Sequence, residues 1–337
     1  GPLDDATVWL LGPERAARLP AAPVPPPESQ AFPAGGYAVM RAGQGASAAY
    51  LVFDCGPFGY PPAPGHGHAD ALSFELFAAG RTLVVDPGVY SYHLGAAWRN
   101  YFRGTSAHNT LVVDGQDQSV LVGEWHVLRP APVVWQDWLT TPELDLVVGS
   151  QAGYARLPQP VTHTRCLVFV KPEYWILVDW LTGRGEHRLD LLFHFMPGAV
   201  VTSEPGSGVV RVADGEAGLA LAPTPGWPAE ICAGAEAPIQ GGVSRRSGEK
   251  APAPVACFSR VARAPAAFAA ALIPHRAGAA VEARVEWLSV QDAHGRALAG
   301  PDVLGLRVTG AGWSDDLVLD RRAAPGPKVF GDCASAA

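Results

Sequence analysis

The chain has 337 residues, a net charge of −7 and a pI near 5.8, and 48% of its residues are hydrophobic. This length allows two average domains or one large β architecture with a substantial core. The acidic balance and the lack of a basic stripe argue against a nucleic-acid partner, so an acidic ligand would need a local cluster of arginines.

The numbers of turn-forming residues and cysteines narrow the possible fold classes further. The 38 glycines and 32 prolines favour many turns over long helices. The five cysteines are scattered without a CxxC motif, which indicates neither a disulfide framework nor a thiolate zinc site. No apolar run reaches 18 residues, so no membrane span is expected. No signal peptide is visible, and Gly1-Pro2 resembles the remnant of a cleaved tag.

Three regions follow one another along the chain. Residues 1–18 are predicted to form a helical stub, broken at Gly12-Pro13, and residues 19–34 a proline-rich linker. From residue 35 to residue 337 the chain consists of short apolar or alternating runs separated by Gly, Pro and Asp, which is typical of an all-β antiparallel sandwich or barrel. The clearest of these runs are residues 37–42, 49–55, 72–78, 82–86, 109–114, 132–139, 145–150, 164–170, 174–181, 188–195, 208–213, 266–273, 280–288, 304–310 and 316–320.

Three histidines, His66, His68 and His108, and the aspartate Asp86 stand out between residues 65 and 119. In a strand, His66 and His68 would point to the same side. Asp86 ends an apolar run, and His108 begins another. Histidines and a carboxylate on adjacent strands suit a divalent metal, and this set of N and O ligands favours zinc over manganese or calcium. The alternative is a merely polar loop.

A second feature is the mixture of aromatic residues and arginines in residues 98–103, WRNYFR. Sugar rings stack on aromatic faces, and arginine pairs with carboxylate or sulfate. The alternative is an ordinary loop that covers the sandwich. Tyr90, Tyr92 and Tyr101 are candidate proton-transfer groups.

Other patterns carry less weight. Ser106, His108 and Asp86 could form a hydrolytic triad, although the metal interpretation uses two of the three. His163 and His194 lie in apolar runs and are expected to be core residues. Residues 234–254, rich in Gly, Ala, Pro and charge, are predicted to form a mobile excursion.

Two runs, HGHADALSFELFAAGRTLVVDPGVYSY and WRNYFRGTSAHNTLVVDGQDQS, closely resemble the heparinase II/III-like family of polysaccharide lyases. The resemblance is strongest over residues 35–119 and fades after about residue 200. It implies a C-terminal multi-sheet β-sandwich, preceded by an α/α toroid of which residues 3–18 would be the last helix. It further implies zinc bound by His68, Asp86 and His108, with His66 facing the substrate.

The activity implied by this resemblance is β-elimination on a uronic-acid-containing polysaccharide. His66, Tyr92 and Tyr101 would be catalytic, and Trp98, Arg99 and Arg103 would bind substrate, while zinc would have a structural role. An acidic poly- or oligosaccharide and the upstream toroid are the implied partners, and a periplasmic or secreted location is expected. Two alternatives are a non-catalytic carbohydrate-binding or assembly module and a zinc-dependent hydrolase.

Overall fold

The computed structural model describes residues 5–18, 28–60, 62–279, 281–292, 294–298, 302–321, 328–330 and 333–335. Near the amino-terminal end, Gly12 separates helix α1 (Asp5–Leu11) from helix α2 (Pro13–Ala16). Gly12 has a φ of 76°, which residues with a side chain rarely adopt, and Pro13 begins the second helix. The predicted break is therefore confirmed. Residues 19–27 of the predicted linker lie outside the described residues, and no helix in the described part is long and apolar enough to cross a membrane.

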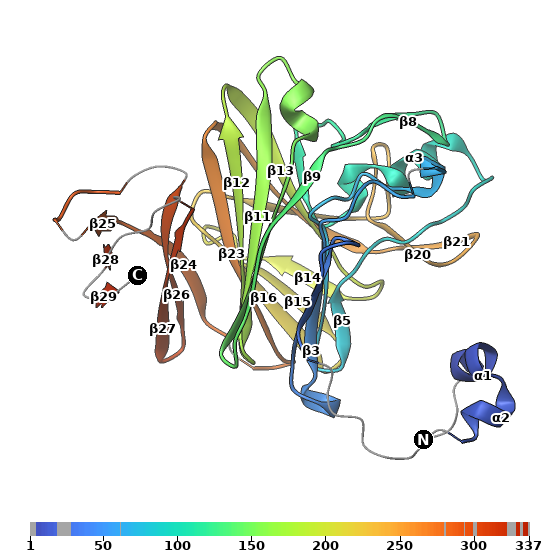
Figure 1. The fold of residues 1–337 in the computed structure, drawn as a ribbon, viewed down its shortest axis with the longest axis horizontal. Coiled ribbons are helices and arrows are strands. Elements are labelled where there is room, and N and C mark those ends of the chain that lie inside the picture. Colours follow the sequence, from blue (N-terminus) through green and yellow to red (C-terminus); the bar gives the residue numbers. More distant parts are fainter. Residues whose placement is uncertain are drawn as a thin grey trace.

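The first sheet begins earlier than the sequence predicts, because the strand of residues 30–32 lies inside the expected linker. Its five antiparallel strands follow chain order (Figure 1): β1 (Gln30–Phe32), β2 (Tyr37–Ala42), β3 (Ala49–Asp54), β4 (Phe74–Ala78) and β5 (Arg81–Val84). The β4–β5 hairpin turns at Ala79 and Gly80, with φ values of 50° and 80°, as expected for a tight hairpin turn.

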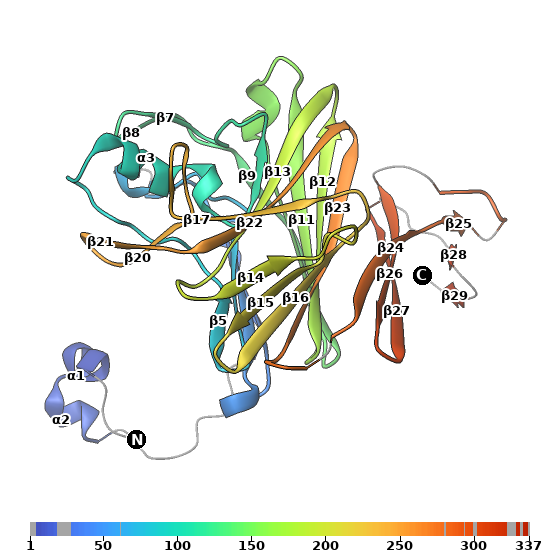
Figure 2. The same ribbon diagram turned by 180° about the vertical axis from the view of Figure 1, so that it is seen from behind.

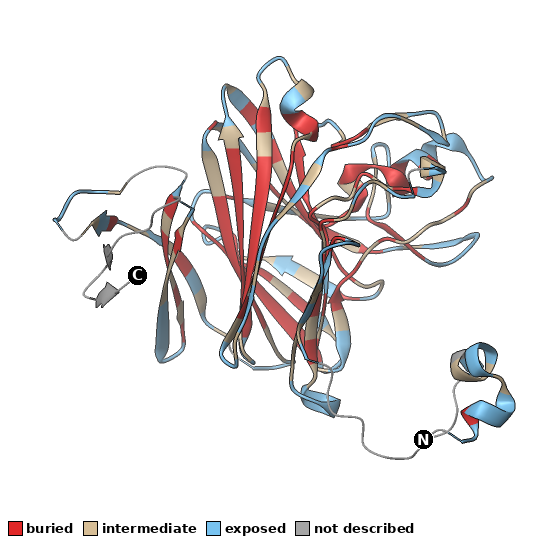
Figure 3. Ribbon diagram, viewed as in Figure 1, coloured by how far each residue is buried: buried red, intermediate tan, exposed pale blue. Residues whose placement is uncertain are grey.

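The largest sheet has eight antiparallel strands and forms the centre of the molecule (Figures 1 and 2). Its order is β14 (Val200–Ser203), β15 (Val210–Asp214), β16 (Ala217–Pro223), β23 (Ala266–Arg276), β12 (Tyr174–Gly183), β11 (Val161–Val170), β10 (Leu144–Gln151) and β9 (Val133–Thr140). Strand β12 is buried on both faces along most of its length, which explains why its sequence, YWILVDWL, is a continuous apolar run and does not alternate (Figure 3).

Further sheets cover this central sheet. A four-stranded sheet consists of β17 (Ala229–Ala233), β22 (Pro254–Arg263), β13 (Glu186–His194) and β6 (Leu111–Val113), and a three-stranded sheet of β24 (Ala283–Leu288), β26 (Val303–Gly310) and β27 (Trp313–Asp320). Smaller pairings join β7 (Val120–Val122) with β8 (His126–Arg129), β18 (Ala235–Glu236) with β19 (Ile239–Gln240), β20 (Gly242–Arg246) with β21 (Glu249–Pro252), and β25 (Val290–Asp292) with β28 (Lys328–Phe330) and β29 (Cys333–Ser335).

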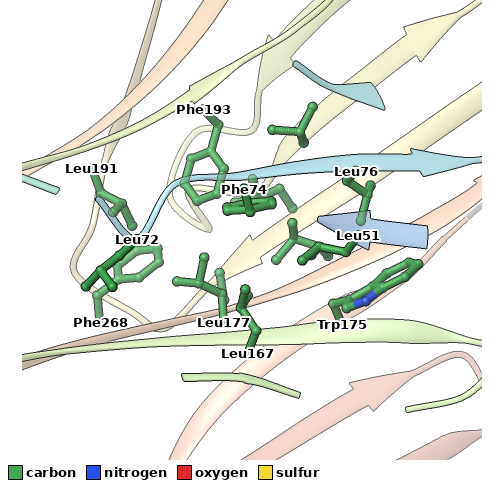
Figure 4. Packing of buried hydrophobic residues seen from close by; sticks show 14 of the residues in the cluster. Leu51, Leu72, Phe74, Leu76, Leu167, Trp175, Leu177, Leu191, Phe193 and Phe268 are labelled. Carbon is green, nitrogen blue, oxygen red and sulfur yellow. The ribbon is translucent and has the colours of Figure 1, made fainter. Parts of the chain in front are cut away.

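Two hydrophobic cores lie on opposite faces of the central sheet. The larger core packs it against the five- and four-stranded sheets, through side chains that include Leu51, Phe74, Trp175 and Phe193 (Figure 4). The smaller core packs its other face against the three-stranded sheet. The predicted all-β antiparallel sandwich is thus confirmed, with three layers of sheet.

Several strands are absent from the prediction. β16, β17 and much of β22 are rich in Ala, Gly or Pro, which have low strand propensity, so their pairing with neighbouring strands makes them strands. Residues 234–254, predicted as a mobile excursion, contain the β18–β19 and β20–β21 hairpins. Both hairpins contact helix α3 (Ala96–Arg103).

Candidate functional site

The segment that carries His66 and His68 is a turn and not a strand, which corrects the expectation that both imidazoles share one strand face. A single 3-10 turn spans Pro64–His66, and His68 follows after Gly67. A side chain at position 67 would lie 2.7 Å from the Phe58 ring, so this tight path requires glycine. His66 ends exposed and His68 partly buried.

A group of potential metal ligands forms where His68 meets His108. Ligand atoms of His68, Asp70 and His108 all lie within 4.8 Å of one another. The Nε2 atoms of both histidines are buried and have no hydrogen-bond partner in the described part of the chain. Buried imidazole nitrogens without a partner are costly, and a cation would satisfy them, so the residues present fit a metal ion.

Asp86, two residues after the end of β5, contacts this cluster through His108 and is not in the group whose ligand atoms lie within 4.8 Å of one another. Its Oδ2 atom lies 2.7 Å from Nδ1 of His108. The structure also adds Asp70, which sequence reasoning missed. The signal that could have found it is its spacing of two residues from His68.

The two carboxylates differ in their preferred charge state. Burial would raise the pKa of Asp86, but His108 and its hydrogen bond overcome this and bring the pKa below its usual value. Burial raises the pKa of Asp70 above its usual value. The two carboxylates also differ in position: Asp70 has an oxygen within 4.8 Å of the ligand atoms of both histidines, whereas Asp86 contacts Nδ1 of His108.

The pKa values of His68 and His108 are shifted in opposite directions. Burial, helped by the nearby His108, lowers the pKa of His68 to about 3, so His68 is neutral and ready to coordinate a cation. Burial opposes the charge on His108, but Asp86 raises the pKa of His108 to about 9. Nε2 of His108 has no hydrogen-bond partner among the described residues, so the Ser106–His108–Asp86 triad does not form.

Two buried polar side chains hold the loops of this cluster together. Asn109 donates from Nδ2 to the carbonyls of Phe74 (2.9 Å) and Val85 (2.8 Å), and thereby joins the ends of β4 and β5. Arg165 on β11 donates from Nη1 to the carbonyls of Leu72 (2.7 Å) and Asn109 (2.6 Å). These bonds connect the loops that carry His68 and His108 to the central sheet.

Arg165 is itself fixed by a buried ion pair. Its Nε and Nη2 atoms donate to Asp179 on β12 at 2.8 and 2.9 Å, and His163 contacts the same carboxylate at 2.7 Å. His163 and His194 are both fully buried, which confirms them as core residues. Arg165 therefore acts as a positioning residue for the metal cluster.

An exposed aromatic group lies on the other side of the His66 turn. Nδ1 of His66 is 3.4 Å from the Tyr92 hydroxyl, and the Tyr92 and Trp125 rings are stacked with centroids 5.4 Å apart. The His66 ring meets both of these rings edge-on. Trp125 was missed by sequence reasoning, because it lies between β7 and β8, just beyond the recognised motif that ends at Ser119. His66, Tyr92 and Trp125 are called the His66 face below.

Tyr101 does not belong to this face, contrary to its predicted catalytic role. It is buried, and its hydroxyl donates to Gln240 (2.7 Å) and accepts from the amides of Gly241 and Gly242. Burial raises the pKa of Tyr101 to about 12. This hydroxyl ties α3 to the β18–β19 hairpin and has no path to a substrate.

Arg99 and Arg103 are likewise placed beneath the surface, although the sequence predicted that they bind substrate. Arg99 is 2% exposed and Arg103 is 0% exposed. Arg99 donates to the Gly65 carbonyl at 2.8 Å and lies under the rings of Tyr92 and Trp125, and Arg103 donates to the Gly67 carbonyl at 3.2 Å. Both arginines support the His66 turn from inside, and only Trp98 of the predicted binding trio is partly exposed.

Tyr101→Phe is expected to destabilise the fold by about 1–3 kcal/mol, because it leaves buried polar groups of the Gln240–Gly242 segment without a partner. Denaturant unfolding of the chain measures this loss. Tyr50→Phe, at a partly exposed position whose hydroxyl forms no hydrogen bond within the described residues, is the matched control. Equal stability of the two variants would contradict the structural role of Tyr101.

Residues 24–256 match the family described as Heparinase II/III-like, C-terminal. The chain is 27% identical over 164 residues to a heparin-sulfate lyase of Pedobacter heparinus and 25% identical over 212 residues to a heparin-sulfate lyase of Bacteroides stercoris. These alignments cover 48% and 59% of this chain, but only 22% and 29% of the two relatives.

Solved structures give the same picture of the fold. Heparan sulfate lyase HepC from Pedobacter heparinus matches 92% of this chain with a TM-score of 0.72 and 20% identity, and a heparinase III structure matches 89% with a TM-score of 0.70 and 17% identity. This chain covers 45% and 43% of those two chains. It therefore spans less than half the length of the relatives that it matches.

Proposed function

Because this chain belongs to the heparinase II/III-like family, whose C-terminal region it matches, we propose that it is the β-sheet part of a polysaccharide lyase. The reaction that we propose is β-elimination on a uronate unit of an acidic polysaccharide. The observation that carries this proposal is the exposed contact between His66 and Tyr92, two groups that can each transfer a proton, beside a buried cluster of potential metal ligands.

In β-elimination a base removes the C5 proton of the uronate, the 4-O-glycosidic bond breaks, and the leaving oxygen takes up a proton. The product sugar then carries a C4–C5 double bond. His66 and Tyr92 are proposed to exchange protons with the substrate or to pair with its carboxylate, since negative charge develops there during proton removal. The adjacent Trp125 ring offers a face on which a sugar ring can stack.

We also propose that His68, Asp86 and His108 bind zinc. The partnerless Nε2 atoms of the two histidines and the ionised state of Asp86 support this assignment. Bound zinc would link the loops that carry these ligands and so stabilise the turn that presents His66. Elimination requires no attacking water, so the proposed role of the metal is structural.

The second half of the active site is proposed to come from an upstream α/α toroid. This is consistent with the small share of each curated relative that the chain covers, 22% and 29% in the two cases above. Because the proposed catalytic residues of the toroid are not part of this chain, the isolated chain is expected to be inactive or very weak. An acidic polysaccharide substrate also favours a periplasmic or secreted location.

His66→Ala in the full-length protein is expected to lower kcat by about 10²–10⁴-fold, because it removes a group that transfers a proton or offsets charge at the reacting sugar. The assay follows ultraviolet absorbance of the unsaturated product on heparan sulfate, alginate and other polyuronates. His294→Ala, at an exposed position where the backbone amide and not the imidazole forms a hydrogen bond in the described part of the chain, is the matched control.

The outcomes of this assay separate the candidate functions. No unsaturated product from the full-length protein on any substrate, together with glycan binding, would identify a non-catalytic carbohydrate-binding module. Saturated products that disappear on zinc removal would identify a zinc-dependent hydrolase. Either result contradicts the proposed lyase.

A further inference from the structure

The β20–β21 hairpin is fastened to the segment that follows Asp86. The amide of Ser244 donates to the Pro87 carbonyl at 2.8 Å, and the amide of Gly248 donates to the Tyr90 carbonyl at 2.7 Å. A side chain at Gly88 would meet the Ser244 carbonyl at 2.4 Å, so the two segments approach as closely as a glycine allows. The same segment thus connects the metal cluster at one end to this hairpin at the other.

Three cations lie on the hairpin, Arg245, Arg246 and Lys250, and all three are exposed. In the described part of the chain none of them forms an ion pair within 4.0 Å of a carboxylate. Two acidic residues lie near the cations. Glu249 is opposite Arg246 in the hairpin register, and Glu75 interacts electrostatically with Arg245. Even with Glu249 counted, the hairpin has a surplus of positive charge in a chain of net charge −7.

An aromatic surface adjoins these cations. Nζ of Lys250 lies 3.9 Å from the centroid of the Trp98 ring and 5.8 Å from that of Tyr90, and these two rings meet edge-on at 6.0 Å. Trp98 and Tyr90 are both partly exposed. The group of Trp98, Arg245, Arg246 and Lys250 is called the hairpin surface below.

Helix α3 places this surface beside the His66 face. Consecutive helical residues point about 100° apart, so Trp98 and Arg99 leave α3 in different directions. Arg99 extends beneath Tyr92 and Trp125, whereas Trp98 packs toward Tyr90 and Lys250. Figures 1 and 2 both show α3 and the β20–β21 hairpin on the same side of the molecule. A polymer that crosses α3 from the His66 face would therefore meet the hairpin surface.

We propose that the hairpin surface is an anion-binding subsite for the acidic groups of a polysaccharide, distinct from the residues that contact the reacting sugar. The two guanidinium groups suit the planar geometry of carboxylate or sulfate, and the ammonium group over one face of the Trp98 ring adds a positive charge beside them. The choice of a polysaccharide rests on the proposed function, and the anion preference rests on the hairpin itself.

The test measures binding of polysaccharides to the chain by isothermal titration calorimetry at two salt concentrations. Heparan sulfate carries sulfate and carboxylate, alginate carries carboxylate only, and dextran carries neither. The variant combines Arg245→Ala, Arg246→Ala and Lys250→Ala, and the matched control combines Arg184→Ala, Arg284→Ala and Arg296→Ala. The control residues are also exposed, and their loss removes the same charge.

The hairpin variant is expected to bind the preferred acidic polymer about tenfold or more weakly at low salt, and the difference should shrink as salt screens the charges. The control variant should bind like the unaltered chain, and neither protein should bind dextran. Loss of affinity for heparan sulfate alone would assign the surface to sulfate, and loss for both polymers to carboxylate. Circular dichroism checks that the variants are folded.

Equal affinity of the hairpin variant and the control would overturn this inference. The outcome is separable from failure of the lyase proposal. A full-length enzyme that releases unsaturated product, with a KM unaffected by the hairpin substitutions, would contradict only the subsite. Binding of acidic polymers that depends on the hairpin, without any unsaturated product, would contradict only the lyase.

Discussion

His68→Ala protein is expected to be isolated without zinc and to unfold at a lower temperature than the unaltered chain. The substitution removes a neutral, partly buried imidazole from the proposed ligand set. A ligand that binds only the folded state stabilises it in proportion to the logarithm of its concentration over Kd, or about 4 kcal/mol at 1,000 times Kd. Elemental analysis and thermal unfolding with and without chelator measure the two effects.

The carboxylate variants make this experiment sharper. Asp86→Asn is expected to lose zinc as His68→Ala does, because it removes the proposed carboxylate ligand, whereas Asp70→Asn should keep zinc because Asp70 lies near both histidines but outside the proposed ligand set. The reverse result would make Asp70 the ligand and Asp86 the residue that orients His108. A chelator that leaves the melting temperature of the unaltered chain unchanged would contradict a structural metal altogether.

Arg165→Met is expected to destabilise the chain by about 3–5 kcal/mol, because it leaves the buried Asp179 carboxylate without its guanidinium partner and with His163 still in contact. It also removes the hydrogen bonds to the Leu72 and Asn109 carbonyls. Denaturant unfolding measures the loss of stability, and zinc titration measures the effect on the metal cluster.

A double variant separates the positioning role of Arg165 from a role in stability alone. Arg165→Met with Asp179→Leu removes both charges and should recover part of the lost stability. It cannot restore the bonds to Leu72 and Asn109, so zinc binding is expected to remain weaker by about tenfold or more, as is common when outer contacts of a metal site are lost. Zinc affinity that recovers together with stability would contradict the positioning role.

The sequence alone determined the fold class and the main parts of the metal cluster. Strand runs such as those of β3, β4 and β12 are local patterns, and the ordered motifs around His68, Asp86 and His108 lie within a single stretch of about forty residues. Local patterns of this kind can be recognised in a sequence because strand propensity and turn chemistry depend on residues that are near neighbours along the chain. The family resemblance drawn from these motifs is confirmed by the match over residues 24–256.

Only the tertiary structure decided which side chains are available to a ligand. Arg99, Arg103 and Tyr101 look like site residues in sequence, but partners far along the chain bury them, as when Gln240 meets the Tyr101 hydroxyl. Trp125, Asp70 and Arg165 do not look like site residues in sequence, but their contacts in the fold bring them to the site. Burial and long-range hydrogen bonding depend on residues separated by many positions, and a sequence does not show which of those residues meet.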